Sequence, residues 1–500
     1  MAARASRGTL IIIGAGVAGL ATACYGRRNG YDTVVFEMHD KPGGMCTSWR
    51  RGDYVFDYCI HNLAGTGKGS GLHGVWDELG TLDGVDVIDR DEFVRIEGPS
   101  GERLHWYTDL DRLEAHLKES APEDRAAIAD LVGAARRLAG GDLFAAQLGG
   151  IRRMLRASTR LPALNRWSGV TLGQFADRLH DPFLRRALVH AQYDIPGEEV
   201  PLTALLLFMA GMSDGDLGWP VGGSLAFSAR VEQSVRDLDG EIRYRSRVEK
   251  ILVEHDRAVG VRLADGTEHR ADRVISAADG FNTIYGMLDG RYVTEAIERY
   301  YAGAGDVGPF GFVVFLGVRG TMEGEPHALT LLLDEPIDLG GVRQDSVHLT
   351  VFGPESGLAP EGSSIVKIET QARYSYWKEL RDRDLAAYRR RKEDLADALV
   401  ERLGPRFPDL ASRVETMDVC TPPTAERFTG NRFGWQAGPP REDAKRIQRE
   451  GLSKTLPGLD RFHHVGQWST ATLGVSSAAV MARALVKELC KQDGRRFVAA

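Results

Sequence analysis

The sequence predicts an α/β fold that begins as a doubly wound parallel sheet. Residues 9–13 (Thr-Leu-Ile-Ile-Ile) are an apolar run rich in β-branched side chains, which is typical of a strand buried on both faces. A glycine-rich turn at 14–19 follows at once and leads into a helix over 20–29. Residues 33–37 then have the character of a second strand. The order strand, turn, helix and strand is the first unit of such a sheet.

The composition excludes several classes of protein. Of the 500 residues, 43% are apolar and 27% are charged, which excludes a collagen, a coiled-coil rod and bulk disorder. The net charge of −7 argues against nucleic acid as a partner. Five widely spaced cysteines without a C-x-x-C pair predict neither a disulfide framework nor a zinc site. We find no signal peptide and no apolar run of roughly 20 residues, so we expect a cytoplasmic protein, with peripheral membrane contact as an alternative.

Helical and strand-like patterns continue along the rest of the chain. Residues 76–215 are predicted to be mostly helical. Residues 219–280 return to short alternating strands, with Asp265-Gly266 as the turn of a β-hairpin. The later elements that we predict are strands at 309–318, 328–333, 346–352 and 364–371, a charged helix at 376–403, a strand at 462–465 and a helix at 476–491.

The first candidate functional motif, GAGVAG, directly follows the first strand. Gly14 permits the tight turn out of the strand, Gly16 lets a diphosphate approach the backbone, and Gly19 lets the helix pack closely. Val17 and Ala18 lie within the motif just before the predicted helix, where amides and the positive end of the helix dipole bind a diphosphate. The motif therefore predicts a dinucleotide site of the Rossmann type.

Two further segments fit the same dinucleotide. Glu37 ends the second strand about 20 residues after the motif, where a carboxylate binds the ribose hydroxyls, and we include its neighbour Met38 in the site. Gly43 and Gly44, followed by Met45, would bring more amides to the diphosphate; the alternative is a plain loop. Because the 271–280 segment has no second G-x-G-x-x-G, we predict no built-in nicotinamide-binding domain.

Together these motifs resemble the FAD-dependent phytoene desaturase and amine oxidase superfamily of flavoproteins. The resemblance is carried by GAGVAGL, by the acidic strand end, by PGG at 42–44 and by GDYVFD at 52–57. ERFTGNRFGWQAG at 426–438 and VGQWSTATLGVSSAAVMA at 465–482 resemble the family's C-terminal segments, in the same order. FDYCIHNLAG at 56–65 is most similar to the branch of retinol saturases, carotenoid isomerases and bacterial phytoene-dehydrogenase-related proteins.

The resemblance implies a Rossmann-like FAD-binding domain that is discontinuous, with the topology of the GDP dissociation inhibitors (GDI), and an inserted α+β substrate-binding domain. The FAD-binding domain would comprise residues 1–75, 216–290 and 440–500. The substrate-binding domain would comprise residues 76–215 and 291–439, with a helical part at 91–215.

The resemblance also implies contacts with FAD in the later parts of the chain. Val248 occupies the position where the family's adenine meets a strand backbone. Gly466 and Gln467 occupy the position of a Gly-Asp pair that contacts the ribityl chain and the diphosphate; glutamine replaces the acid here, and its amide can still hydrogen-bond. The turn Gly474-Val475-Ser476 would lie beneath the flavin pyrimidine ring, where helix amides stabilise negative charge on a reduced flavin.

His61 is the catalytic candidate. It lies in a loop that the family places near the flavin, where an imidazole could deliver or remove a proton as hydride moves. The alternative is a structural hydrogen bond, and Tyr58 and Cys59 are weaker candidates. We expect His463-His464 to end a strand near the surface, and we predict no metal site.

These features predict an FAD-dependent oxidoreductase that desaturates or saturates carbon–carbon bonds of an apolar, polyene or isoprenoid-like small molecule. One alternative is redox-neutral isomerisation of a double bond by reduced flavin, and another is amine oxidase-type chemistry. A third is a GDI-like binding protein that lacks flavin, against which the intact glycine motif argues.

Two segments suggest how such a substrate would reach the protein. Residues 202–212 (LTALLLFMAGM) are either a buried helix or the wall of a tunnel for a long apolar molecule. Arg152, Arg153, Arg156 and Arg160 are interleaved with apolar residues. This run is either a solvated face or a contact for anionic lipid or an acidic carrier protein.

Overall fold

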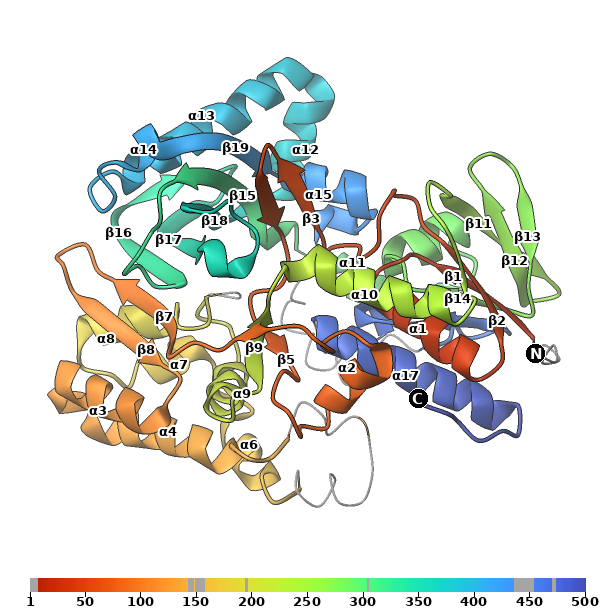
Figure 1. Ribbon diagram of the computed structural model, residues 1–500, viewed down its shortest axis with the longest axis horizontal. Helices are drawn as coiled ribbons and strands as arrows, with labels where there is room; N and C mark the ends of the chain where they lie inside the picture. Colours follow the sequence, from red (N-terminus) through yellow and green to blue (C-terminus); the bar gives the residue numbers. More distant parts are fainter. Residues whose placement is uncertain are drawn as a thin grey trace.

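A five-stranded parallel sheet organises one half of the molecule (Figure 1). The computed structural model describes residues 8–142, 148, 158–193, 197–303, 305–435, 454–469 and 474–500. The strands, in spatial order, are β10 (Glu241–Arg243), β2 (Asp32–Phe36), β1 (Thr9–Ile13), β14 (Arg273–Ser276) and β20 (Phe462–His464). Every neighbouring pair is parallel. Segments far apart in the sequence thus meet in one sheet, and the predicted α/β, Rossmann-like fold class is confirmed.

The alternation of side chains along β1 explains why this sheet is covered on both faces. Leu10 and Ile12 pack into one core with helices α1 (Val17–Arg28), α10 (Gly223–Asp237) and α17 (Val475–Gln492), which lie together in Figure 1. Ile11 and Ile13 point to the other face and pack into a second core. A strand buried on both sides needs a continuous apolar run, and residues 10–13 supply it.

The second core is closed by a three-stranded antiparallel sheet. Its strands are β11 (Val248–Glu254), β12 (Arg257–Leu263) and β13 (Glu268–Arg270). The hairpin predicted at Asp265-Gly266 is confirmed, because β12 and β13 are antiparallel on either side of it and Gly266 has a φ of +87°. Val248, Ile251 and Val261 pack against the parallel sheet.

A seven-stranded sheet forms the second half of the molecule (Figure 1). In spatial order its strands are β19 (Val414–Cys420), β15 (Val307–Arg319), β18 (Ser363–Arg373), β17 (Arg343–Phe352), β16 (Ala328–Asp338), β7 (Glu92–Glu97) and β8 (Arg103–Tyr107). All pairs are antiparallel except β16 with β7. Helices α12 (Tyr374–Arg383), α13 (Leu385–Leu403) and α14 (Leu410–Arg413) pack against it.

A separate helical layer covers the β7–β8 end of this sheet. Its helices are α3 (Leu110–Ser120), α4 (Arg125–Leu138), α6 (Leu161–Trp167), α7 (Leu172–Ala176), α8 (Pro182–Leu188) and α9 (Leu202–Ser213). The remaining elements that concern the site are β3 (Ser48–Arg51), β4 (Tyr54–Asp57), β5 (Leu63–Ala64), α2 (His73–Leu79), β6 (Val87–Ile88), β9 (Leu217–Pro220), α11 (Glu295–Ala302) and α15 (Pro422–Thr429). Across the described ranges, no helix combines the length and the apolar character needed to cross a membrane.

Two predictions are wrong in part. The segment 91–215, expected to be helical, begins with the β7–β8 hairpin, whose first strand pairs in parallel with the distant β16. The helix expected at 376–403 is two helices, because Asp384 has an extended backbone and its carboxylate accepts the amides of Ala386 and Ala387 to begin α13. Long-range pairing and a local cap here outweigh the helical pattern of the sequence.

Candidate active site

A cavity of about 1990 Å³ lies between the parallel sheet and the seven-stranded sheet. It collects residues from the glycine motif, the loops around β3 to β5, β11, α9 and α17. The predicted site residues that line it are Gly14, Gly16, Val17, Ala18, Glu37, Met38, Gly43, Gly44, Met45, His61, Val248, Gly466, Gln467, Gly474, Val475 and Ser476. The structure therefore brings segments from three distant parts of the chain to one place. Gly19, the remaining predicted residue, lies behind the wall in α1.

The glycine motif has the backbone geometry that a phosphate-binding turn requires. Gly14 has a φ of +97°, which favours glycine. A Cβ on Gly19 would lie 2.0 Å from the carbonyl oxygen of Gly14, so only glycine allows the helix to pack so closely against the turn. No side chain within the described residues caps the start of α1 at Gly16. The amides of its first turn are therefore available to an anion in the cavity.

The second glycine loop lies directly against the first. The amide of Gly43 donates to the carbonyl of Ala15 at 2.8 Å, and Gly16 and Gly43 form an isolated parallel bridge. Gly43 has a φ of +105°, and a Cβ there would lie 2.1 Å from the carbonyl oxygen of Cys46. The backbone at Gly43 thus lies too close to its neighbours for any side chain, so this segment is not a freely variable connection.

Glu37 holds the turn and the strand end together. Its carboxylate accepts the amide of Ala15 at 2.7 Å and the amide of His39 at 2.8 Å, and the residue is buried. Burial raises the pKa of Glu37, and these two amides act in the opposite direction. The carboxylate therefore organises the loop itself, in addition to facing the cavity in which we predict a ribose.

The start of α17 forms the opposite wall of the cavity. Gly474 precedes the helix with a φ of +99°, and the hydroxyl of Ser476 donates to the carbonyl of Ala64 on β5 at 3.1 Å. Gly466 lies so close to α1 that a Cβ there would approach Cβ of Ala18 to 3.0 Å. The beginnings of two helices, α1 and α17, thus line one cavity.

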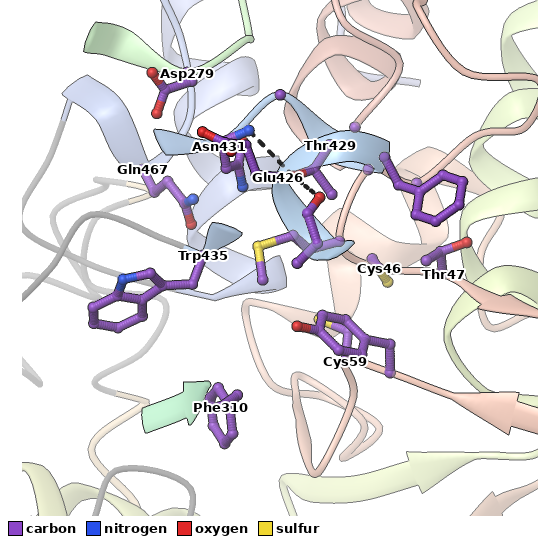
Figure 2. A pocket seen from close by; sticks show the side chains of 18 of the residues that line it. Cys46, Thr47, Cys59, Asp279, Phe310, Glu426, Thr429, Asn431, Trp435 and Gln467 are labelled. Atoms are coloured by element: carbon purple, nitrogen blue, oxygen red, sulfur yellow. Dashed lines mark hydrogen bonds between the residues drawn. The ribbon is translucent and has the colours of Figure 1, made fainter. Parts of the chain in front are cut away.

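Asp279 and Asn431 add polar groups to the cavity, although the sequence analysis did not assign them to the site (Figure 2). They line it together with the predicted Gln467 and the ring of Trp435. Asp279 is buried and accepts the amides of Asn282 and Arg432 at 2.7 and 3.2 Å. Burial raises its pKa to about 6, and the two amides oppose this shift.

His61 lies in the loop between β4 and β5 and is nearly buried. Its Nε2 is 2.8 Å from a carboxylate oxygen of Glu369 and 3.4 Å from the ammonium of Lys367. Its ring stacks on Phe310 with a centroid distance of 5.3 Å. An imidazole that touches the cavity and is held by charged partners has the geometry of a general acid or base.

The sequence analysis missed Lys367 and Glu369, although a signal was present. Both lie on β18, two residues apart, and therefore point to the same face of a strand whose neighbouring residues are buried. Burial alone would raise the pKa of Glu369, but the neighbouring His61 and Lys367 outweigh burial and lower it. Two charged residues at an i, i+2 spacing in an apolar strand indicate a buried ion pair.

The other candidates have mixed outcomes. Tyr58 is buried, with its pKa raised by burial, and Cys59 lines the cavity. The expectation that His463-His464 lies near the surface is wrong: both are buried, and burial lowers their pKa values to about 4 and about 3. Within the described ranges, no group of three or more His, Cys, Asp and Glu residues is arranged to hold a metal ion.

The apolar segment 202–212 lies within α9 and has both buried and cavity-lining residues. Leu202, Leu205 and Leu206 are buried in the core of the helical layer, whereas Ala204 and Phe208 line the cavity. Arg152, Arg153 and Arg156 lie outside the described residues, as do residues 436–438 of the ERFTGNRFGWQAG segment and residues 470–473 of the last motif. Arg160 donates to the hydroxyl of Thr159.

The fold and the cavity define a dinucleotide-binding protein of the Rossmann class. Residues 12–79 match the family model for the NAD(P)-binding Rossmann-like domain. Among solved structures, an oxidoreductase from Methanosarcina mazei has a TM-score of 0.62 at 17% identity, covering 96% of this chain and all of that one. A RAB GDI from Plasmodium falciparum has a TM-score of 0.50 at 9% identity, covering 99% and 100%.

Curated proteins match more of the chain than the family model does. Prolycopene isomerase of Arabidopsis thaliana is 24% identical over 94% of this chain and 80% of that protein. Lycopene-forming phytoene desaturase of Pseudescherichia vulneris is 27% identical over 70% and 74%. All-trans-retinol 13,14-reductase of Danio rerio is 23% identical over 87% and 79%. The chain is a homologue of the phytoene desaturase, carotenoid isomerase and retinol saturase proteins, and the predicted enzyme class, a phytoene desaturase-like oxidoreductase, is confirmed.

Proposed function

We propose that the protein is an FAD-dependent oxidoreductase that desaturates or saturates carbon–carbon bonds of an apolar polyene or isoprenoid-like molecule. The observation that carries this proposal is the single cavity that joins the glycine motif, the start of α17, an apolar wall and His61. A bound flavin supplies two-electron oxidation or reduction of the substrate. The residues of this chain supply binding, orientation and the proton.

The wall of the cavity fits FAD at several points along an extended dinucleotide. The uncapped first-turn amides of α1 fit the diphosphate. The loop at Gly43 and Gly44 fits it too, since a side chain at Gly43 would collide with the backbone and the loop therefore presents bare backbone. Val248 fits the adenine end, and the α17 N-terminus fits an electron-rich ring. We assign the predicted contacts of Met38, Met45 and Gln467 to the same cofactor.

The apolar residues of the cavity wall fit an apolar substrate. Phe208, Phe310 and Trp435 contribute aromatic surface to the cavity, Ala204 of α9 also lines it, and Phe310 stacks on His61. His61 is then the residue placed to exchange a proton with the substrate. Peripheral contact of the arginine run with anionic lipid or an acidic carrier protein stays a prediction.

Anaerobic mixing of the purified, yellow protein with candidate polyenes tests the proposal. Bleaching of the flavin absorbance identifies oxidation of the substrate, and reoxidation of pre-reduced flavin identifies saturation. A changed double-bond geometry without net bleaching identifies the alternative, redox-neutral isomerisation. A colourless protein that does not bind added FAD would contradict the proposal.

Glu37→Ala should weaken FAD binding by about 2 kcal/mol, the scale of a charge-assisted hydrogen bond. The variant loses the predicted ribose contact and also the acceptor for the amides of Ala15 and His39, so the turn becomes less ordered. Flavin fluorescence after dialysis measures the affinity. Glu254→Gln, which changes an exposed carboxylate on β11, is the control and should retain its flavin. Full flavin occupancy of dialysed Glu37→Ala would contradict the assignment.

A further inference from the structure

Two oppositely charged side chains of β18 are buried against the candidate catalytic histidine. The side chains of Lys367 and Glu369 are only 2% and 3% exposed. Burial of two charges carries a desolvation cost that their mutual attraction does not reliably exceed. Stability alone is therefore a weak reason for this pair, and its contacts with His61 indicate another role.

The two carboxylate oxygens of Glu369 contact different partners, His61 and Lys367. Nε2 of His61 lies 2.8 Å from Oε2, and the ammonium of Lys367 lies 2.8 Å from Oε1. Lys367 also donates to the carbonyl of Tyr58 at 2.9 Å and lies 3.4 Å from Nε2 of His61. The imidazole thus faces an anion and a cation through the same nitrogen.

The surroundings of His61 also include two imidazoles, a carboxylate and a phenol. His348 on β17 is buried, burial lowers its pKa to about 3, and it is therefore neutral at neutral pH. His327 is a second imidazole whose pKa is lowered by burial. Asp57, at the end of β4, is held by the amide and hydroxyl of Ser224. Tyr193 approaches the ring edge at 5.7 Å.

We propose that Glu369 and Lys367 are positioning residues that set the tautomer and the charge state of His61. The carboxylate holds the proton on Nε2, so that Nδ1 is the nitrogen that exchanges a proton. The carboxylate favours a proton on the imidazole, and the ammonium, 3.4 Å from the same nitrogen, opposes it. This inference rests on the proposed function.

The step assigned to His61 is a proton transfer alone. In desaturation, one substrate C–H bond breaks, its proton forms an N–H bond at Nδ1, and its electron pair becomes part of the new double bond. The flavin of the proposed function is the two-electron oxidant that takes hydride from the neighbouring carbon. In saturation the proton returns from Nδ1 to carbon, and the imidazole becomes neutral again.

Nitrogen NMR of [¹⁵N]histidine-labelled, flavin-loaded protein tests the inference without any substrate, with the His61 signals assigned by their loss in His61→Gln. In the wild type we expect the neutral tautomer with the proton on Nε2. In Glu369→Gln the ammonium faces Nε2 without a carboxylate, so the proton should move to Nδ1. In Lys367→Met the uncompensated carboxylate should keep His61 charged to a pH higher by about one unit or more.

A similar cluster on β7 and β8 provides matched controls. Glu92 has an oxygen 2.8 Å from Nδ1 of His105 and accepts hydrogen bonds from Arg95 at both oxygens, at 3.2 and 2.8 Å. None of the three residues lines the cavity. Glu92→Gln and Arg95→Met should leave the His61 signals unchanged. Lys367→Arg, which restores the cation, should move the signals back towards the wild type. Glu369→Asp keeps the carboxylate and should keep the Nε2 tautomer, which provides a test if Glu369→Gln does not fold.

The outcomes separate this inference from the proposed function. Unchanged His61 signals in both Glu369→Gln and Lys367→Met, or shifts of the same kind in both, would overturn the positioning role even if the enzyme is active. The expected opposite changes without turnover of any polyene would support the positioning role and contradict only the proposed function. In an active enzyme, the acid limb of the pH–rate profile should move to higher pH in Lys367→Met.

Discussion

Replacement of Gly19 by alanine should leave the protein without bound flavin and lower its free energy of unfolding by about 3 kcal/mol. The added Cβ would lie 2.0 Å from the carbonyl oxygen of Gly14 and 3.1 Å from its carbonyl carbon. Both atoms belong to the backbone, so α1 would have to move away from the glycine turn at Gly14 that precedes it. Urea unfolding and the ratio of flavin to protein after purification measure the two effects.

The matched control is Gly74→Ala in α2. Nothing lies within 4 Å of a Cβ at this position, and alanine is a better helix former than glycine by about 0.5–1 kcal/mol. The control should therefore keep its flavin and unfold at the same or a higher urea concentration. If Gly19→Ala keeps its flavin and its stability, as Gly74→Ala should, then the flavin site does not depend on the close packing of α1 against the glycine turn.

His61→Ala should lower turnover about a hundredfold or more, the usual scale for the loss of a general acid or base. The flavin content should not change, because the predicted diphosphate contacts are made by other residues, at the glycine motif and at Gly43 and Gly44. His61→Gln is the sharper variant, since glutamine keeps much of the volume and one hydrogen bond but does not titrate near neutral pH. Single-turnover flavin reduction by the substrate measures the effect.

His105→Gln is the control for His61→Gln, because it removes an imidazole that also lies 2.8 Å from a glutamate but does not line the cavity. It should retain wild-type turnover. Normal turnover of both His61 variants would make the residue structural, and the proton would then come from water or from the substrate itself.

Features that depend on local backbone geometry and local patterns of apolar residues could be predicted from the sequence. Gly14 and Gly43 are identified because their positive φ angles and close contacts exclude side chains, and the apolar run at 9–13 fits only a strand buried on both faces. The same local logic predicted the hairpin at Asp265-Gly266.

Features that depend on distant pairing could not be predicted in this way. Glu369 meets His61 across 308 positions of the chain, and only the register of β18 brings them together. The β7–β8 hairpin was hidden because its partner, β16, lies more than two hundred residues later. Periodicity identifies which face of a strand is buried, but not which distant side chain it will meet.

The order of the strands in the parallel sheet has a consequence for synthesis on the ribosome. The central strand β1 is made first, whereas its neighbour β14 and the edge strand β20 emerge more than two hundred residues later. The cofactor site is divided in the same way, with one wall within residues 14–44 and the opposite wall at 466–467 and 474–478. A nascent chain therefore lacks the second wall until residues 474–478 have been translated. Contacts of such long sequence separation form slowly, so we expect flavin capture to follow synthesis of this second wall and not synthesis of the glycine motif alone.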